Sequence, residues 1–212
     1  MAAKRGRSMA MIETMSHDDF ESKCWHYYLM LERDLLDAEK YVAFSEKNDS
    51  VFSLHFARQL ISVCMEIESL CKLFTKNDAN DKSGNIIIYF SEILKIYPDL
   101  NKWDAKMLYT HREFKPFANL DLTANNPTLP WWKCYTKIKH YRIEHEEDGS
   151  LLNVLNAMAA LYLLMIEGLK KTANNCKKSF CIDAPLESSH LFEDKKLEYL
   201  SLKNIYFVKD HN

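Results

Sequence analysis

Glycine and proline are scarce in this sequence, which has only four Gly and five Pro among 212 residues. Proteins made of β-strands use both residues in their turns, because glycine tolerates positive φ and proline fixes φ near the value that a turn requires. A large β-sandwich would need many more of them. The composition therefore favours helices.

The sequence also lacks a large excess of either charge. Its 28 Lys and Arg nearly cancel its 30 Asp and Glu, which leaves a net charge of −2. A protein that binds nucleic acid over its whole surface carries a basic excess, so that class is disfavoured and only a local basic patch fits. The 47% of hydrophobic and 27% of charged residues are ordinary for a soluble globular protein. The chain is long enough for one domain with a substantial core.

Long hydrophobic runs are absent as well. The apolar stretch from Leu151 to Ile166, within the longest run without a charge, contains two Asn. This is short and polar for a membrane span, so a buried central helix is predicted. The opening "MAAKRGRSMAM" has bases but lacks the apolar core of a secretory signal. We expect residues 1–15 to be a disordered lead and the protein to be cytoplasmic.

The six cysteines include no CxxC pair. Four of them lie within helical patterns: Cys24, Cys64, Cys71 and Cys134. Such cysteines are typical of free, buried thiols in a reducing cytosol. Cys176, Cys181 and His190 could approach one metal ion, but the set is incomplete and its spacing fits no zinc module. We therefore expect no metal and no cofactor.

Several catalytic motifs are missing too. The sequence contains no P-loop, no GxSxG, no HExxH and no cluster of carboxylates. NTPase, serine hydrolase and metal hydrolase functions consequently have no support.

Helical periodicity is what the sequence does contain. Helices are predicted over residues 18–44, 51–74, 85–97, 104–110, 130–141 and 151–171. Ser16, Ser50 and Ser150 are the expected N-caps, and Pro130 is the expected first residue of its helix. Residues 111–130, with three Pro, should form an ordered, extended excursion. Two later patches, 179–185 and 197–208, have β-like character.

These elements predict an all-α fold: an up-and-down helical bundle of about five helices with a short irregular or β-hairpin C-terminal tail. Residues 16–171 should form the bundle, and residues 172–212 should form an extension packed on it. In the first helix the apolar stripe is expected at Phe20, Cys24, Tyr27, Leu31, Leu35 and Ala38. Glu32 lies off that stripe.

The helix over residues 51–74 has one acid in an unexpected place. At roughly 100° per residue, Glu68 lies in the apolar arc between Ala57 and Ile61, whereas Glu66 and Gln59 lie on the polar arc. An unpaired buried charge costs several kcal/mol or more, so Glu68 should have a basic partner elsewhere. Lys139 and His140 are the candidates.

The stretch "WWKCYTKIKHYRIEH", residues 131–145, gathers bases and aromatics. On a helix, Lys133, Lys137 and His140 share one face, and the opposite face carries aromatic residues that should pack inward. The bases could simply favour the helix C-terminus and pair with the acids of "IEHEED".

The same bases also suit a metal-independent ribonuclease, because RNA carries its own 2′-OH nucleophile. In that interpretation His140 or His145 is the general acid or base. The candidate residues for binding phosphate or stacking bases are Lys133, Lys137, Lys139, Arg142, His145 and Trp132.

Three segments carry a resemblance to a known family: "YVAFSEKNDSVFSLHFARQLISVCMEIESLCKLF", "PWWKCYTKIKHYR" and "SLLNVLNAMAALYLLMI". Over roughly residues 16–171 the chain resembles small bacterial helical proteins that are similar to the HEPN (higher eukaryotes and prokaryotes nucleotide-binding) superfamily. The resemblance implies a dimeric helical bundle. It also implies metal-independent RNase activity of the kind found in toxin–antitoxin, phage-defence and CRISPR systems.

The hallmark of that superfamily is Arg, four to six residues, then His. His140 matches the His, but Lys133 stands where the Arg is expected, and Lys lacks the planar fork of Arg. The resemblance implies that His140 is the general acid or base and that Glu68 orients a base. The neighbouring cations would then bind phosphate.

Three functions remain open from the sequence. The first is a HEPN-like RNA-binding protein or endoribonuclease, a homodimer with an antitoxin-type protein partner. The second is a non-catalytic helical protein-interaction module with a structural Glu/Lys/His ion-pair hub. The third is a binder of a small molecule or nucleotide, with residues 111–130 closing over a pocket.

Overall fold

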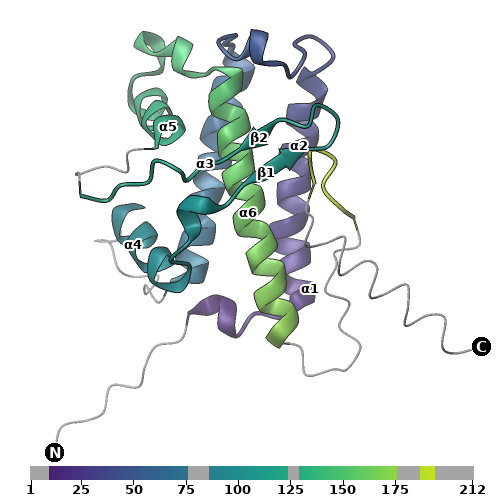
Figure 1. The fold of residues 1–212 in the computed structure, drawn as a ribbon, viewed down its shortest axis with the longest axis vertical. Helices are drawn as coiled ribbons and strands as arrows, with labels where there is room; N and C mark the ends of the chain where they lie inside the picture. Colours follow the sequence, from purple (N-terminus) through teal and green to yellow (C-terminus); the bar gives the residue numbers. More distant parts are fainter. Residues whose placement is uncertain (1–9, 76–85, 124–128, 176–186, 194–212) are drawn as a thin grey trace, which may run out of the picture.

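The computed structural model describes residues 10–75, 86–123, 129–175 and 187–193, which form a mostly helical protein with a small three-stranded sheet (Figure 1). The helices are α1 (His17–Phe20), α2 (His26–Ala38), α3 (Leu54–Phe74), α4 (Ile86–Ile96), α5 (Pro130–Tyr141) and α6 (Leu151–Asn175). Helices α2, α3 and α6 lie side by side, α4 and α5 flank α3, and the sheet crosses α6 (Figure 1).

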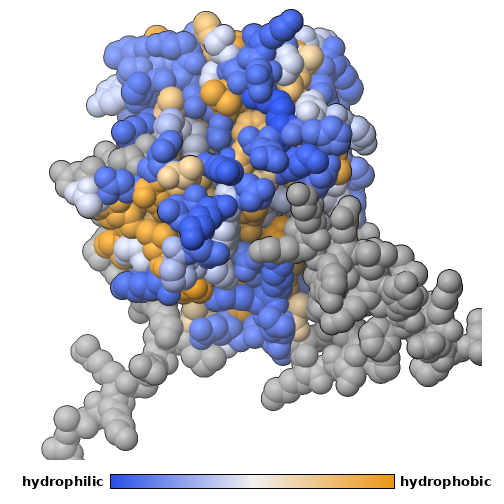
Figure 2. Space-filling view, viewed as in Figure 1, coloured by the Kyte–Doolittle hydropathy of each residue, from blue (hydrophilic) through white to orange (hydrophobic). Residues whose placement is uncertain are grey.

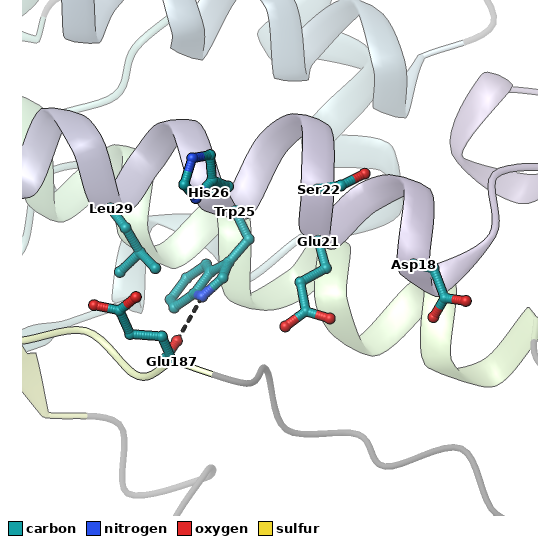
Figure 3. Close-up of a pocket in the computed structure, with 7 residues that line it drawn as sticks. All are labelled: Asp18, Glu21, Ser22, Trp25, His26, Leu29 and Glu187. Atoms are coloured by element: carbon teal, nitrogen blue, oxygen red, sulfur yellow. Dashed lines mark hydrogen bonds between the residues drawn. The ribbon is translucent and has the colours of Figure 1, made fainter.

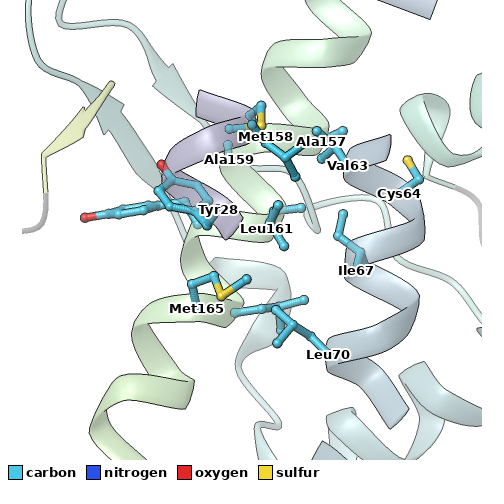
Figure 4. Close-up of a cluster of buried hydrophobic side chains, with 14 of the residues drawn as sticks. Tyr28, Val63, Cys64, Ile67, Leu70, Ala157, Met158, Ala159, Leu161 and Met165 are labelled. Atoms are coloured by element: carbon cyan, nitrogen blue, oxygen red, sulfur yellow. The ribbon is translucent and has the colours of Figure 1, made fainter. Parts of the chain in front are cut away.

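Helix α6 is the centre of the core. Its side chains are buried along most of its length, as the sequence predicted, and they pack against α1, α2, α3 and α5. Figure 4 shows Leu161 and Met165 of α6 facing Ile67 of α3. By length and composition α6 could cross a membrane, but most of it is buried inside this protein. Each fully buried large apolar side chain contributes about 1.5–3 kcal/mol to folding.

Of the predicted N-caps, Ser16 is confirmed and Ser50 is wrong. The Ser16 hydroxyl accepts the amide of Asp19 at 3.1 Å at the start of α1. Helix α3 is capped by Ser53, which accepts the amide of Phe56 at 3.1 Å, and not by Ser50. The reason is an antiparallel bridge between Phe52 and Ser150, which keeps the chain extended up to Ser53.

A π-helical turn, Glu21–Trp25, joins α1 to α2. A π turn holds one residue more than an α turn, so the buried face is displaced just after the turn, although Leu31 and Leu35 are buried as predicted. Tyr28 is consequently fully buried, while Tyr27, which was predicted to be in the stripe, is 40% exposed. Glu32, predicted to lie off the stripe, is buried. The helix also ends earlier than predicted, at Ala38.

The predicted helix over residues 104–110 is wrong. The segment forms strand β1 (Ala105–Met107), the centre of an antiparallel sheet of order β2-β1-β3 with β2 (Glu113–Phe114) and β3 (Phe192–Glu193). Ala105 and Met107 are buried on either side of the less buried Lys106, a strand period of two. The hairpin turn places His111 at φ 57°.

The ends of the described chain are packed. The 3-10 turn Met11–Glu13 buries Ile12, so the expected disordered lead does not extend through residue 15. The amide of Asn175 donates to the Ile12 carbonyl at 3.0 Å. Leu191 and Phe192 are buried beside the helices. The two β-like patches, 179–185 and 197–208, lie outside the described residues.

Candidate functional site on helix α5

Helix α5 has the bounds that the sequence predicted, and its aromatic side faces the core. The indole N–H of Trp131 donates to the Pro116 carbonyl at 2.9 Å. Trp132 is 3% exposed and packs edge-on against Phe90. The prediction that Trp132 stacks on bases is therefore wrong, because the helical period turns this ring into the core.

Glu68 of α3 meets two side chains of α5. Its Oε1 accepts the Tyr135 hydroxyl at 3.2 Å and lies 3.8 Å from the Lys139 ammonium, which in turn donates to the Tyr135 hydroxyl at 3.0 Å. Burial and the Glu68 charge raise the pKa of Tyr135, so its hydroxyl stays protonated and donates. The basic partner inferred for Glu68 is thus Lys139 and not His140.

The Glu68–Lys139 contact is open to solvent. The Lys139 side chain is 45% exposed and the Glu68 side chain 27% exposed. An ion pair at this exposure contributes about 1 kcal/mol or less. The contact therefore adds little to the stability of the protein.

A second group surrounds Asp148, in the turn between α5 and α6. Asp148 Oδ2 lies 3.2 Å from the Lys137 ammonium and 3.4 Å from His145 Nδ1, and Oδ1 accepts the Cys134 thiol at 3.1 Å. The Asp148 hydrogen bond raises the pKa of Lys137. This carboxylate, 15% exposed, is one of the "IEHEED" acids that the sequence offered as partners for the α5 bases.

The remaining candidates lie outside these two groups. Arg142 pairs with Glu146 at 3.5 Å, and both side chains are 48% exposed. Lys133 and His140 are exposed, and no hydrogen bond or ion pair joins either of them to Glu68 within the part of the chain that the structure describes. The predicted set is thus divided and does not converge on one point.

The four cysteines that the structure describes are free and at least partly covered, as predicted for them. Cys64 and Cys71 are buried, and Cys24 and Cys134 are partly buried. Burial raises the pKa of Cys24 to about 11 and that of Cys134 to about 12. Thiols that remain protonated at neutral pH are poor nucleophiles.

The described residues contain no group of three side chains able to hold a metal ion. Cys176 and Cys181, two members of the candidate metal set, lie outside the described residues. The third, His190, is exposed, and its Nε2 lies 3.3 Å from Glu187.

Glu32 is a buried carboxylate that the sequence did not reveal. It is 1% exposed and accepts the Tyr28 hydroxyl at 2.6 Å and the Ser189 hydroxyl. It also accepts the amides of His190 at 2.8 Å and Leu191 at 3.2 Å. The spacing of Tyr28 and Glu32, one helical turn, is the only sequence signal of this arrangement.

No family model, no curated protein and no solved structure matches this chain in the comparisons made.

Proposed function

We propose that the chain is a non-catalytic helical protein-interaction module in which acid–base contacts fix α5 in place. The observation that carries the proposal is the pairing of the predicted phosphate-binding cations. Lys139 faces Glu68, Lys137 and His145 face Asp148, and Arg142 faces Glu146. A phosphate would have to compete with a carboxylate at each of these positions.

The contacts of Glu68 and those of Asp148 link α5 to different parts of the protein. Glu68 links α5 to α3, and Asp148 links α5 to the turn that leads into α6, where Asn153 Nδ2 also donates to the Asp148 carbonyl at 2.9 Å. Both groups act on residues 134–139 of α5, one toward α3 and the other toward the turn that leads into α6. In Figure 1 the chain direction alternates from α2 to α3, α5 and α6, which supports an up-and-down bundle. The two groups of acid–base contacts stabilise this arrangement.

A double-mutant cycle with Glu68→Gln and Lys139→Met tests the structural role. The expected coupling in the free energy of unfolding is below about 1 kcal/mol, because both side chains are partly exposed. Urea unfolding of the four proteins measures it. The matched cycle replaces His140 with Ala in place of Lys139→Met and should show no coupling with Glu68. Coupling to His140 and not to Lys139 would contradict the assignment.

A HEPN-like RNA-binding protein or endoribonuclease is the second candidate. Lys133 and His140 are both exposed on α5, one at each end of the spacing that the resemblance implies. In this proposal two copies form a homodimer that brings two such sets together, and an antitoxin-type protein is the natural partner.

Fluorescence anisotropy with labelled single-stranded RNA, together with a cleavage gel, separates the two candidates. The interaction module predicts neither saturable binding nor cleavage. The nuclease predicts both, with His140→Ala and Lys133→Gln abolishing cleavage and Lys102→Gln, an exposed lysine far along the chain, leaving it intact.

A further inference from the structure

The segment of residues 187–193 lies in a groove between α2 and strand β1, far in the sequence from both of them (Figure 1). On the α2 side, the indole N–H of Trp25 donates to the Glu187 carbonyl at 2.7 Å (Figure 3). Glu32 of α2 accepts two consecutive main-chain amides of the segment, at 2.8 and 3.2 Å. This wall of the groove therefore holds the segment by its main chain.

The β1 side of the groove also binds the main chain of the segment. The Leu108 amide donates to the Leu191 carbonyl at 3.0 Å, and Phe192 pairs with Met107 in the antiparallel register of β1 and β3. Leu191 and Phe192 are each 2% exposed, and the Phe192 ring stacks on Tyr162 with 5.3 Å between ring centroids. Main-chain hydrogen bonds along an extended segment, with buried positions for particular side chains, are the features of peptide recognition by strand addition.

The segment is open to solvent along part of its length. Glu187, Ser188 and His190 are exposed, and Figure 2 shows mainly hydrophilic residues around the neighbouring hairpin. Two cavities, of about 570 and about 330 Å³, adjoin the segment on its α2 side and share Leu29 and Glu187 as lining residues. Releasing the segment therefore uncovers two buried side chains and leaves the contacts between the helices intact.

The stretch of chain that joins α6 to the segment is long. Trp25, which binds Glu187, packs against Tyr162 of α6 with 6.4 Å between ring centroids. Asn175, at the end of α6, lies thirteen residues beyond Tyr162, which is about 20 Å along the helix. The twelve residues from Asn175 to Glu187 can span about 40 Å when extended. The segment can therefore reach its own groove with roughly 20 Å to spare, or reach the groove of a second copy.

A second copy of the chain carries the same segment and the same groove, so each contact described within one chain can also form between two. Docking within one chain is favoured at low protein concentration, because a tethered segment has an effective concentration in the millimolar range. Docking between chains gains as the protein concentration rises. Exchange of an identical element between two chains is a low-cost route to a dimer.

We propose that the groove between α2 and β1 is a binding site for an extended peptide segment, and that its occupant in trans is residues 187–193 of a second copy of this chain. Trp25 and Glu32 bind the main chain of that segment. Its Leu191 and Phe192 side chains fill the two buried positions. The inference does not rest on the contacts of α5, so its failure would leave the function proposed above unchanged.

Two full-length variants test the exchange. The receptor variant carries Leu191→Ser and Phe192→Ser, so its own segment loses its apolar anchors while its groove is intact. The donor variant carries Trp25→Phe and Glu32→Gln, so its groove is weakened while its segment is intact. Size-exclusion chromatography with light scattering should show each variant alone as a monomer and their mixture as a one-to-one dimer.

A fluorescein-labelled peptide of residues 187–193 measures the site without a second chain. Fluorescence anisotropy should show the receptor variant binding this peptide at least about tenfold more tightly than the wild type, whose groove is occupied by its own segment. Adding Trp25→Phe and Glu32→Gln to the receptor variant should remove this binding. The matched control adds Tyr27→Phe and Glu39→Gln, two exposed residues of α2 and its C-terminal end, and should keep it.

Circular dichroism checks that each variant keeps its helices, and Leu191→Ala alone replaces the receptor variant if the double substitution lowers the helical signal. Mixing the receptor variant with a donor that also carries Leu191→Ser and Phe192→Ser removes every intact segment and should leave monomers. A dimer in that mixture would overturn the exchange, and so would monomers alone in the first mixture. Equal peptide binding by the wild type and the receptor variant would overturn the groove as a binding site.

Discussion

Replacing Glu32 with Gln should loosen residues 187–193 from α2 while leaving the helices folded. The carboxylate accepts two hydroxyls, from Tyr28 and Ser189, and two main-chain amides, from His190 and Leu191. A Gln side chain has one acceptor oxygen and one donor –NH2. If its oxygen keeps the contacts of Oε1, its –NH2 faces the His190 amide, and two donors then oppose each other.

The magnitude follows from that count. One hydrogen bond to a charged group is lost, worth about 1.5–3 kcal/mol, and the His190 amide is left without a partner. A neutral side chain is easier to bury than a carboxylate, which offsets part of the loss. The expected net decrease in the free energy of unfolding is about 2 kcal/mol. For a chain of this length that corresponds to a fall in Tm of about 4–8 °C.

Urea unfolding gives the global change, and amide hydrogen exchange localises it. The amides of His190 and Leu191 should exchange faster in Glu32→Gln, and so should the Leu108 amide, which donates to the Leu191 carbonyl at 3.0 Å. Glu39→Gln, an exposed acid just after α2, is the matched control and should change neither quantity. Unchanged exchange at His190 in Glu32→Gln would refute the role given to this carboxylate.

Two further substitutions probe the core and a half-buried acid. Gly168→Ala should lower the free energy of unfolding by about 1–3 kcal/mol, although Ala is the better helix former by about 1 kcal/mol, because overpacking outweighs propensity. The added Cβ would stand 2.1 Å from the Phe20 ring. Adding Phe20→Leu to the same protein should recover part of the lost stability, as measured by urea unfolding. A Gly168→Ala protein as stable as the wild type would contradict this packing. Burial raises the pKa of Glu66 from 4.5 to about 7, so the folded state holds this proton more tightly than the unfolded state and loses stability as pH rises through that interval. The free energy of unfolding of Glu66→Gln should therefore equal that of the wild type below this pH interval and exceed it above. Urea unfolding at a series of pH values measures this, and a difference between the two proteins that stays constant with pH would contradict the burial of Glu66.

The local elements were accessible from the sequence because their signals span only a few residues. Pro130 and the aromatic positions of α5 place that helix at Pro130–Tyr141, and the uncharged run beginning at Leu151 predicts the buried helix α6. Both depend on the helical period, which is a property of neighbouring residues. The inference that Glu68 needs a base was local as well, since it came from its position in an apolar arc.

The π turn shows where that local reasoning fails. One extra residue in Glu21–Trp25 moves the stripe from Tyr27 to Tyr28 and brings Glu32 into the core. The π turn leaves no periodic signal of its own. Gln59 was misplaced for a different reason: it is buried because its amide donates to the Leu31 carbonyl of α2, a partner 28 residues away.

The sequence by itself determined the helical class, the core helix α6, and the aromatic and basic sides of α5. Only the tertiary structure decided that residues 105–107 form a strand, because β1 needs β2 and the distant β3 to complete its hydrogen bonds. The tertiary structure also decided which acid each base meets, since Glu68 comes from another helix and Asp148 from the turn after α5. Periodicity reports the face on which a side chain lies, whereas the path of the chain determines what faces it.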